Sequence, residues 1–204
     1  AITKFPIAGG MPFSDISGPD GNVWFTDSGT TSAIGAVDTA TGAITEFTAG
    51  LNVGAKPMGI AVGPDGNIWF TDASTAHPAI GVIDRVTHAI TEYSLAAGSV
   101  PQQGIVAGPD GNIWFGDRGP TPALGKFDVA THTVTEFSNG LPAGNGPGAS
   151  IAVGPDGNLW FVVGATHAAI GRATTAGAIT VFTAGLSPTI RASVIAWRTT
   201  SSPT

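Results

Sequence analysis

The pentapeptide Gly-Pro-Asp-Gly-Asn occurs four times in the chain, and its regular spacing constrains the fold more than any other feature. The copies begin at Gly18, Gly63, Gly108 and Gly154, at intervals of 45, 45 and 46 residues. Proline fixes φ for a turn, aspartate hydrogen-bonds to nearby backbone, and the second glycine supplies the left-handed conformation that closes a hairpin. A period of this length predicts an array of small structural units.

Each unit resolves into four short strands, here called a to d in chain order. In residues 60–93 the segments IAV, NIWFTD, AIGVID and AITEY are separated by GPDG, by a loop and by the turn RVTH. Helical periodicity is absent, and frequent glycine and proline would break a long helix. The four complete repeats cover approximately residues 13–47, 58–93, 103–137 and 149–182.

Strand b places large apolar groups on both of its faces, because a phenylalanine follows a tryptophan in every repeat. These tryptophans are Trp24, Trp69, Trp114 and Trp160. Both faces must therefore be covered, as they are in a propeller blade clamped between two neighbours. We predict that the tryptophans pack between blades and do not stack on sugars. The fold class is all-β, a single β-propeller domain over residues 1–204 with four complete repeats and a partial fifth.

The two ends of the chain hold pieces of this fifth unit. Residues 1–5 resemble a strand d, and residues 188–198 resemble a strand a with no strand b after it. Either the ring closes irregularly at this seam, or chains pair into a larger ring, or a longer propeller includes these repeats. We favour a five-unit ring or a homo-oligomer over a four-bladed ring, with Ile190, Arg191 and Trp197 at the seam or interface.

Composition excludes several classes of partner. The net charge is −6 and the 8 Lys and Arg residues are scattered, which argues against nucleic-acid binding. No apolar run approaches the roughly 18 residues of a membrane-spanning helix, and the chain lacks cysteine.

Ala1 opens directly into a strand-like segment with no signal region, so we expect a cytoplasmic or a mature secreted protein. The abundance of Thr, Ala and Gly favours secretion.

The patterns IGxI(D/T)xxGxITEF and GIxVGPDGNIWFT(D/E) resemble the streptogramin B lyase family, also called the virginiamycin B lyase family. The segment IGRATTAGAITVF is similar to its most repeated unit. The resemblance covers nearly the whole chain. It implies a propeller larger than this chain can complete, and a lyase that opens a cyclic depsipeptide at its ester by elimination. It also implies a magnesium ion and an axial histidine acid or base, placed by the family motifs PHGI before strand a and WFTE at the end of strand b.

This chain departs from the family at both motifs. The histidine position before strand a holds Phe13, Met58, Gln103, Ala149 and, at the seam, Ala192. The glutamate position at the end of strand b holds Asp27, Asp72, Asp117 and Val163. A general acid or base must come within hydrogen-bond reach of its proton, and these side chains cannot supply that chemistry. We predict a non-catalytic binding propeller. The alternative is a lyase of the family type.

The predicted ligand face lies at the channel mouth and is formed by Phe13, Asp15, Met58, Gln103 and Arg118. This mixed apolar and charged funnel suits a small molecule, a cation or a peptide loop. Asp15 stands where other repeats have isoleucine, so it either lines the channel or marks a change of register.

Two further predictions concern the acidic residues, which all except Asp15 occupy recurring positions. Asp27, Asp72 and Asp117 either ring the channel mouth and bind Mg²⁺ or Ca²⁺, or cap their own loops, which we favour. Glu46, Glu92 and Glu136 lie on the outermost strand, where charge discourages pairing between sheet edges.

The histidines are predicted to be loop and turn residues. His77 and His167 lie in loops between strands b and c, on the ligand face, and exposed loop residues are favoured over a metal or catalytic pair. His88 and His132 belong to the turns between strands c and d, at the opposite end of the blades.

Overall fold

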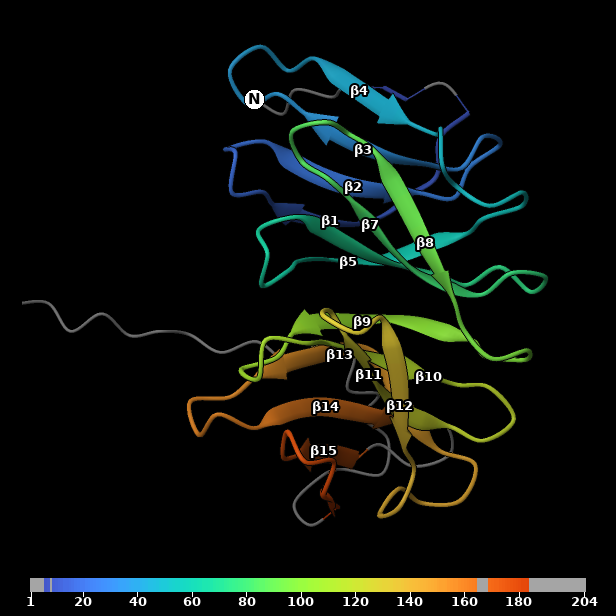
Figure 1. The fold of residues 1–204 in the computed structure, drawn as a ribbon, viewed down its shortest axis with the longest axis vertical. Coiled ribbons are helices and arrows are strands. Elements are labelled where there is room, and N and C mark those ends of the chain that lie inside the picture. Colours follow the sequence, from blue (N-terminus) through green and yellow to red (C-terminus); the bar gives the residue numbers. More distant parts are fainter. Residues whose placement is uncertain (1–5, 8, 165–168, 184–204) are drawn as a thin grey trace, which may run out of the picture.

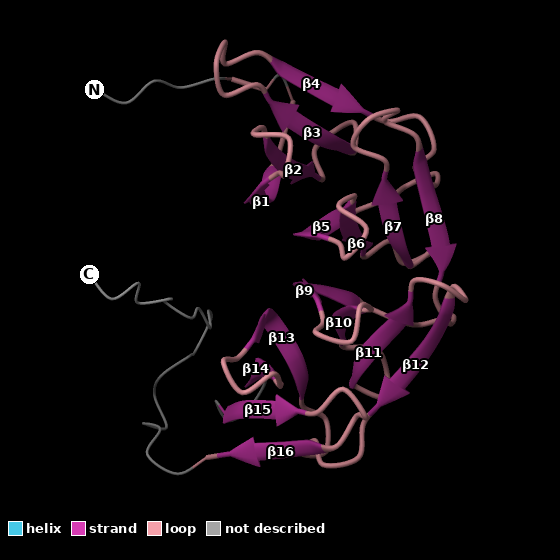
Figure 2. Ribbon diagram, turned by 60° about the vertical axis from the view of Figure 1, so that its left-hand side comes forward, coloured by secondary structure: helices cyan, strands magenta, loops and turns pink. Residues whose placement is uncertain are grey.

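Four antiparallel sheets of four strands each make up a computed structural model that describes residues 6–7, 9–164 and 169–183. Each sheet is a meander in which strands adjacent in sequence are hydrogen-bonded neighbours. The sheets follow one another along the long axis of the molecule (Figure 1). They are arranged around an arc whose inner side carries the first strand of every sheet (Figure 2). This arrangement confirms the predicted β-propeller, and each sheet is one blade.

The blades are numbered 1 to 4 in chain order, and corresponding strands have similar lengths. The inner strands are β1 (Pro12–Ser17), β5 (Pro57–Val62), β9 (Pro101–Ala107) and β13 (Gly146–Val153). The second strands are β2 (Val23–Asp27), β6 (Ile68–Asp72), β10 (Ile113–Asp117) and β14 (Leu159–Gly164). The third strands are β3 (Ala33–Val37), β7 (Ala79–Ile83), β11 (Ala123–Asp128) and β15 (Ala169–Ala173). The outer strands are β4 (Ile44–Phe47), β8 (Ile90–Ser94), β12 (Thr133–Phe137) and β16 (Ile179–Phe182).

The GPDGN turns connect the first two strands of each blade, as the sequence predicts. In blade 4 the Asp156 carboxylate accepts hydrogen bonds from the side chains of Asn158 (2.8 Å) and Trp160 (3.0 Å). These two bonds lower the pKa of Asp156 to about 2. The same three residue types are bonded alike in the other three turns. The turn aspartate therefore also positions the strand-b tryptophan.

The hydrophobic core is divided among the joints between blades. Trp24 of blade 1 packs with Phe70 of blade 2, and Trp69 of blade 2 packs with Phe115 of blade 3. Trp114 of blade 3 packs in the same way with residues of blade 4. These three tryptophans are at most 2% exposed. They confirm the predicted packing role, and truncating one of them to alanine would cost about 3–5 kcal/mol.

The two ends of the chain lie outside the described residues. The predicted seam, with Ile190, Arg191 and Trp197, is therefore not placed. Within the described residues no helix is long and apolar enough to cross a membrane.

Candidate functional site

Every inner strand contains a β-bulge near its first residue. In blade 2 Pro57 pairs with Asp72 and Ile60 pairs with Phe70, so three steps along β5 match two along β6. Register shifts occur at the corresponding place in the other three blades. A bulge bends its strand and re-aims the side chains beside it. The four bulges thus lie at the start of the four inner strands.

These bulges contain the positions that the sequence assigned to the ligand face. Phe13 is 42% exposed in blade 1, Met58 and Gln103 are half-buried in blades 2 and 3, and Ala149 is exposed in blade 4. None of these four side chains carries an ionisable group. The surface that they contribute is apolar, with one amide as a hydrogen-bonding group.

Adjacent inner strands approach each other so closely at the bulges that glycine is required. A methyl group added at Gly59 would overlap the carbonyl oxygen of Gln103 in the next blade. At Gly104 the added carbon would lie 2.8 Å from the carbonyl oxygen of Gly148. The backbones of β5, β9 and β13 are therefore held in direct contact around the inner side of the arc.

Buried threonine hydroxyls connect the bulges of neighbouring blades. Thr26 donates a hydrogen bond of 2.7 Å to the carbonyl oxygen of Met58 in blade 2. Thr71 accepts from the backbone N–H of Gly59 and donates to the carbonyl oxygen of Gln102 in blade 3. In blade 3 Gly116 replaces the threonine, and the backbone of Pro147 fills the space. This bonding fixes the backbone from which Met58 and Gln103 project.

The carboxylates of Asp27, Asp72 and Asp117 are buried within their own blades and do not line the channel mouth. Their exposed fractions are 0%, 0% and 2%. One oxygen of each accepts two backbone N–H groups, from the residue before the inner-strand proline and from the loop after strand b. They therefore cap loops, the role that the sequence analysis favoured. The described residues contain no group of three His, Asp or Glu side chains that could hold a metal ion, and binding of Mg²⁺ or Ca²⁺ stays a prediction.

The remaining predicted site residues lie around the same end of the blades. Arg118 follows β10 and donates a hydrogen bond to the carbonyl oxygen of Gly164, so its guanidinium joins blade 3 to blade 4. Asp15 is exposed on β1, and because all four inner strands change register, it marks no special irregularity. His77 is exposed in the loop after β6. His167 lies outside the described residues.

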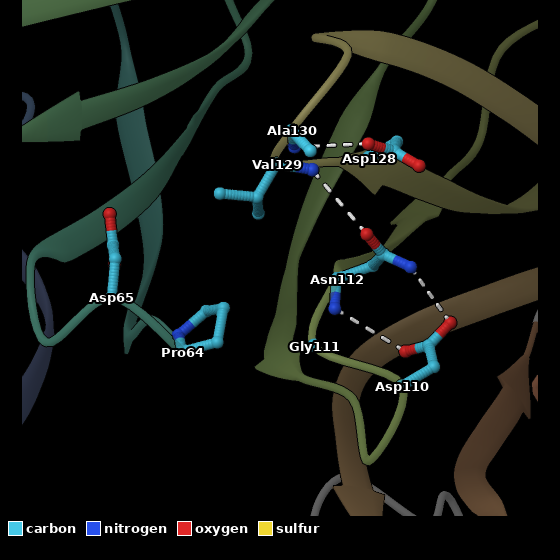
Figure 3. Close-up of a pocket in the computed structure, with 8 residues that line it drawn as sticks. All are labelled: Pro64, Asp65, Asp110, Gly111, Asn112, Asp128, Val129 and Ala130. Atoms are coloured by element: carbon cyan, nitrogen blue, oxygen red, sulfur yellow. Dashed lines mark hydrogen bonds between the residues drawn. The ribbon is translucent and has the colours of Figure 1, made fainter.

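A groove of about 500 Å³ lies between blades 2 and 3 at the opposite end of the strands (Figure 3). Its acidic residues are used within the turns. Asp110 accepts from the backbone and side chain of Asn112 and from the indole of Trp114. Asp128 accepts from the backbone N–H groups of Ala130 and Thr131. The groove is thus a surface of turn residues, as the sequence analysis expected for this end.

The comparisons with known proteins agree with the blade type. The model of the virginiamycin B lyase family matches residues 1–198. The chain belongs to the virginiamycin B lyase family. A sequence comparison with curated proteins gives no match. In the family's terms, the bulges of β1, β5, β9 and β13 are the positions at which the PHGI motif would place histidine.

Solved structures give the same assignment. A virginiamycin B lyase from Staphylococcus aureus is 35% identical, with a TM-score of 0.75 over 86% of this chain. A catalytically inactive histidine-to-alanine variant of virginiamycin B lyase from S. aureus, with quinupristin, is 30% identical with a TM-score of 0.71. The chain spans 56% of the length of both. A chain from a nidogen/laminin complex is 21% identical over 87% of this chain and 66% of its own length, with a TM-score of 0.66, and shows the fold alone.

Proposed function

We propose that this virginiamycin B lyase family chain is a binding propeller whose ligand face lies at the inner-strand bulges, and that it does not open cyclic depsipeptides. The observation that carries the proposal is the content of the four bulges. Phe13, Met58, Gln103 and Ala149 supply apolar surface and one amide, and none of them can exchange a proton near neutral pH. The nearby carboxylates of Asp27, Asp72 and Asp117 are engaged as loop caps.

The face suits a ligand with a large apolar surface and few charges, such as a small cyclic peptide or an apolar peptide loop. Met58 and Phe13 would contact apolar groups, and Gln103 would hydrogen-bond to an amide of the ligand. The rigid backbone beneath them favours binding, since little ordering is needed when the ligand arrives.

Family membership favours a second candidate, a lyase of the family type, and one experiment separates the two. The purified chain is titrated with quinupristin by calorimetry, with and without Mg²⁺, and the ligand is then separated by chromatography to detect opening of the ring. We expect binding without ring opening. Opening of the ring would establish the lyase, and absence of heat would count against this face as a site for cyclic peptides.

A matched pair of variants tests the location of the site. Met58→Ala removes half-buried apolar surface at the blade 2 bulge, and we expect about tenfold weaker binding of quinupristin. Val86→Ala is the control, because Val86 is 72% exposed in a turn at the other end of the blade. Equal affinities of the two variants would place the site elsewhere.

A further inference from the structure

The capping aspartates of the first three blades each have a glutamate of the outer strand on the same face of the sheet. In blade 2 Asp72 pairs with Ala79, while Glu92 pairs with Gly81, two residues further along the same strand β7. All four residues point to one face of the sheet. Because β7 presents only a glycine and an alanine between them, the Glu92 side chain can reach across β7 toward the Asp72 carboxyl group, and the two groups act on each other electrostatically. In blades 1 and 3 the corresponding residues interact in the same sense, because burial and then Asp27 raise the pKa of Glu46, and burial and then Asp117 raise the pKa of Glu136.

In blade 2 two oxygens of this pair are buried without a donor. Asp72 Oδ1 accepts from the backbone N–H groups of Lys56 (2.5 Å) and Ser74 (2.9 Å). Glu92 Oε2 accepts from the backbone N–H of Asn52 at 2.5 Å. The other two oxygens, Asp72 Oδ2 and Glu92 Oε1, have no hydrogen-bond donor. Two neighbouring carboxyl groups in a buried, donor-poor environment cannot both stay ionised unless a cation lies between them. Without a cation, the pair must hold one proton.

Blade 4 shows what replaces the pair when it is absent. Val163 stands at the aspartate position and Val181 at the glutamate position. Val163 is 1% exposed, and Val181 packs against the same core cluster. Both positions change together, from two acids to two apolar residues. The space thus accepts two neutral side chains. A pair of carboxyl groups that shares one proton carries a single negative charge, so it suits this space better than two ionised carboxylates do.

The electrostatics of the pair favour a proton on Glu92. Burial, together with the neighbouring charge and hydrogen bond of Asp72, raises the pKa of Glu92 to about 7. Burial also raises the pKa of Asp72, while the hydrogen bonds from Lys56 and Ser74 oppose this shift. His77, in the loop after β6, is the other titratable group that acts on the pair among the described residues. The Lys56 side chain is exposed, and Lys56 contributes its backbone N–H.

We propose that Asp72 and Glu92 share one proton in a carboxyl–carboxylate hydrogen bond across β7, and that this proton holds the connector between blades 1 and 2. The two acids bind that connector, residues 48–56, at two places: Glu92 at Asn52 in its middle and Asp72 at Lys56 at its end. Lys56 directly precedes the bulge that carries Met58. Loss of the proton puts two negative charges in contact and loosens the connector next to the ligand face. The proposal does not depend on the proposed function.

The direction of the pH effect follows from the raised pKa. Between pH 4.5, the ordinary value for glutamate, and about pH 7, the folded chain keeps a proton that the unfolded chain releases. The stabilisation by the pair is therefore complete below pH 4.5 and is lost as the pH rises through about 7. We expect the urea midpoint of the chain to fall between roughly pH 5 and 8.

The decisive measurement is a carbon-13 NMR titration of the side-chain carboxyl groups in the full chain. We expect the Glu92 carboxyl signal to titrate near neutral pH, with the Asp72 carboxyl signal and the Asn52 and Lys56 amide signals shifting in the same step. A Glu92 signal that titrates alone, in the ordinary range for glutamate, overturns the proposal. This test uses the unaltered chain, so it does not depend on how a variant folds.

A variant adds an independent test. In Glu92→Gln the side-chain NH₂ can donate to Asp72 Oδ2 while the amide oxygen accepts from Asn52, so the protonated state is copied permanently. We expect its urea midpoint to fall less steeply from about pH 5 to 8 than that of the unaltered chain and to lie above it at the upper end, because the pairs in blades 1 and 3 remain. Asp15→Asn, at an exposed carboxylate, should keep the slope of the unaltered chain. The proposal fails if Glu92→Gln keeps that slope, or if Ca²⁺ or Mg²⁺ raises the midpoint of the unaltered chain alone, because a cation then takes the place of the proton.

Discussion

The hydroxyl group of Thr71 donates a hydrogen bond of 2.9 Å to the carbonyl oxygen of Gln102 and so joins blade 2 to blade 3. The same hydroxyl accepts from the N–H of Gly59, at 2.9 Å, inside the bulge of its own blade. Thr71 is fully buried. One side chain therefore satisfies two backbone groups that the bulge would otherwise leave without partners.

Thr71→Val should destabilise the chain by about 1–3 kcal/mol, because valine keeps the shape but leaves the Gly59 N–H and the Gln102 carbonyl unpaired. Urea unfolding followed by tryptophan fluorescence measures the loss. Thr91→Val is the matched control on the exposed side of β8, where we expect a change within about 0.5 kcal/mol. Equal losses in the two variants would show that the hydrogen bonds across the joint contribute nothing.

Gly59→Ala should also destabilise the chain, by about 1–3 kcal/mol. The added methyl group meets the carbonyl oxygen of Gln103 and lies 3.0 Å from the Ile105 side chain. Backbone atoms of β9 cannot yield as a flexible side chain can, so the joint must open. Calorimetric melting measures the effect.

Gly148→Ala provides the control for this substitution in the bulge of blade 4. There the nearest atom to an added carbon, the carbonyl oxygen of Val162, is 3.5 Å away, an ordinary contact. We expect little change in the melting temperature, or a small gain from the reduced freedom of the unfolded chain. A larger loss in Gly148→Ala than in Gly59→Ala would contradict the account of the close approach.

The fold was accessible from the sequence because its signals are local. The GPDGN turns and the tryptophan-phenylalanine pairs fix where strands begin, where they turn and that both faces are covered. The structure has four four-stranded sheets, and Trp24, Trp69 and Trp114 are buried in the joints as expected. The positions of Met58 and Gln103 could be assigned in the same way, because equivalent positions recur at the start of each inner strand.

The environment of the acids was harder to predict, since it depends on contacts between distant segments. Asp72 receives a hydrogen bond from Lys56, 16 residues away, and Glu92 receives one from Asn52, 40 residues away in the connector between blades 1 and 2. The prediction of a charged outer edge is therefore wrong for Glu92, which is half-buried beneath the connector. One signal was available in the sequence. Val163 and Val181 replace the two acids together in blade 4, which suggests that the two positions touch.

The last prediction concerns His88, which the sequence analysis identified as a turn residue. His88 adopts a left-handed conformation with φ of 60°, where blade 1 has Gly42 with φ of 74°. Its ring stacks on Phe47 of blade 1, with 4.3 Å between the ring centroids. The turn of one blade therefore covers the aromatic pair of the preceding blade, and the contact offsets the cost of the left-handed backbone.

Two substitutions separate these contributions. His88→Gly loses the stacked ring, worth about 0.5–1.5 kcal/mol, but relieves the backbone, so the net change in unfolding free energy should be small. His88→Ala loses the ring and keeps the strain, so it should be destabilised by about 1–2 kcal/mol relative to His88→Gly. Urea unfolding of both variants at one pH measures the difference. If alanine at this position were as stable as glycine or more so, the left-handed backbone would carry no cost, and the stacking on Phe47 would not be what permits histidine in this turn.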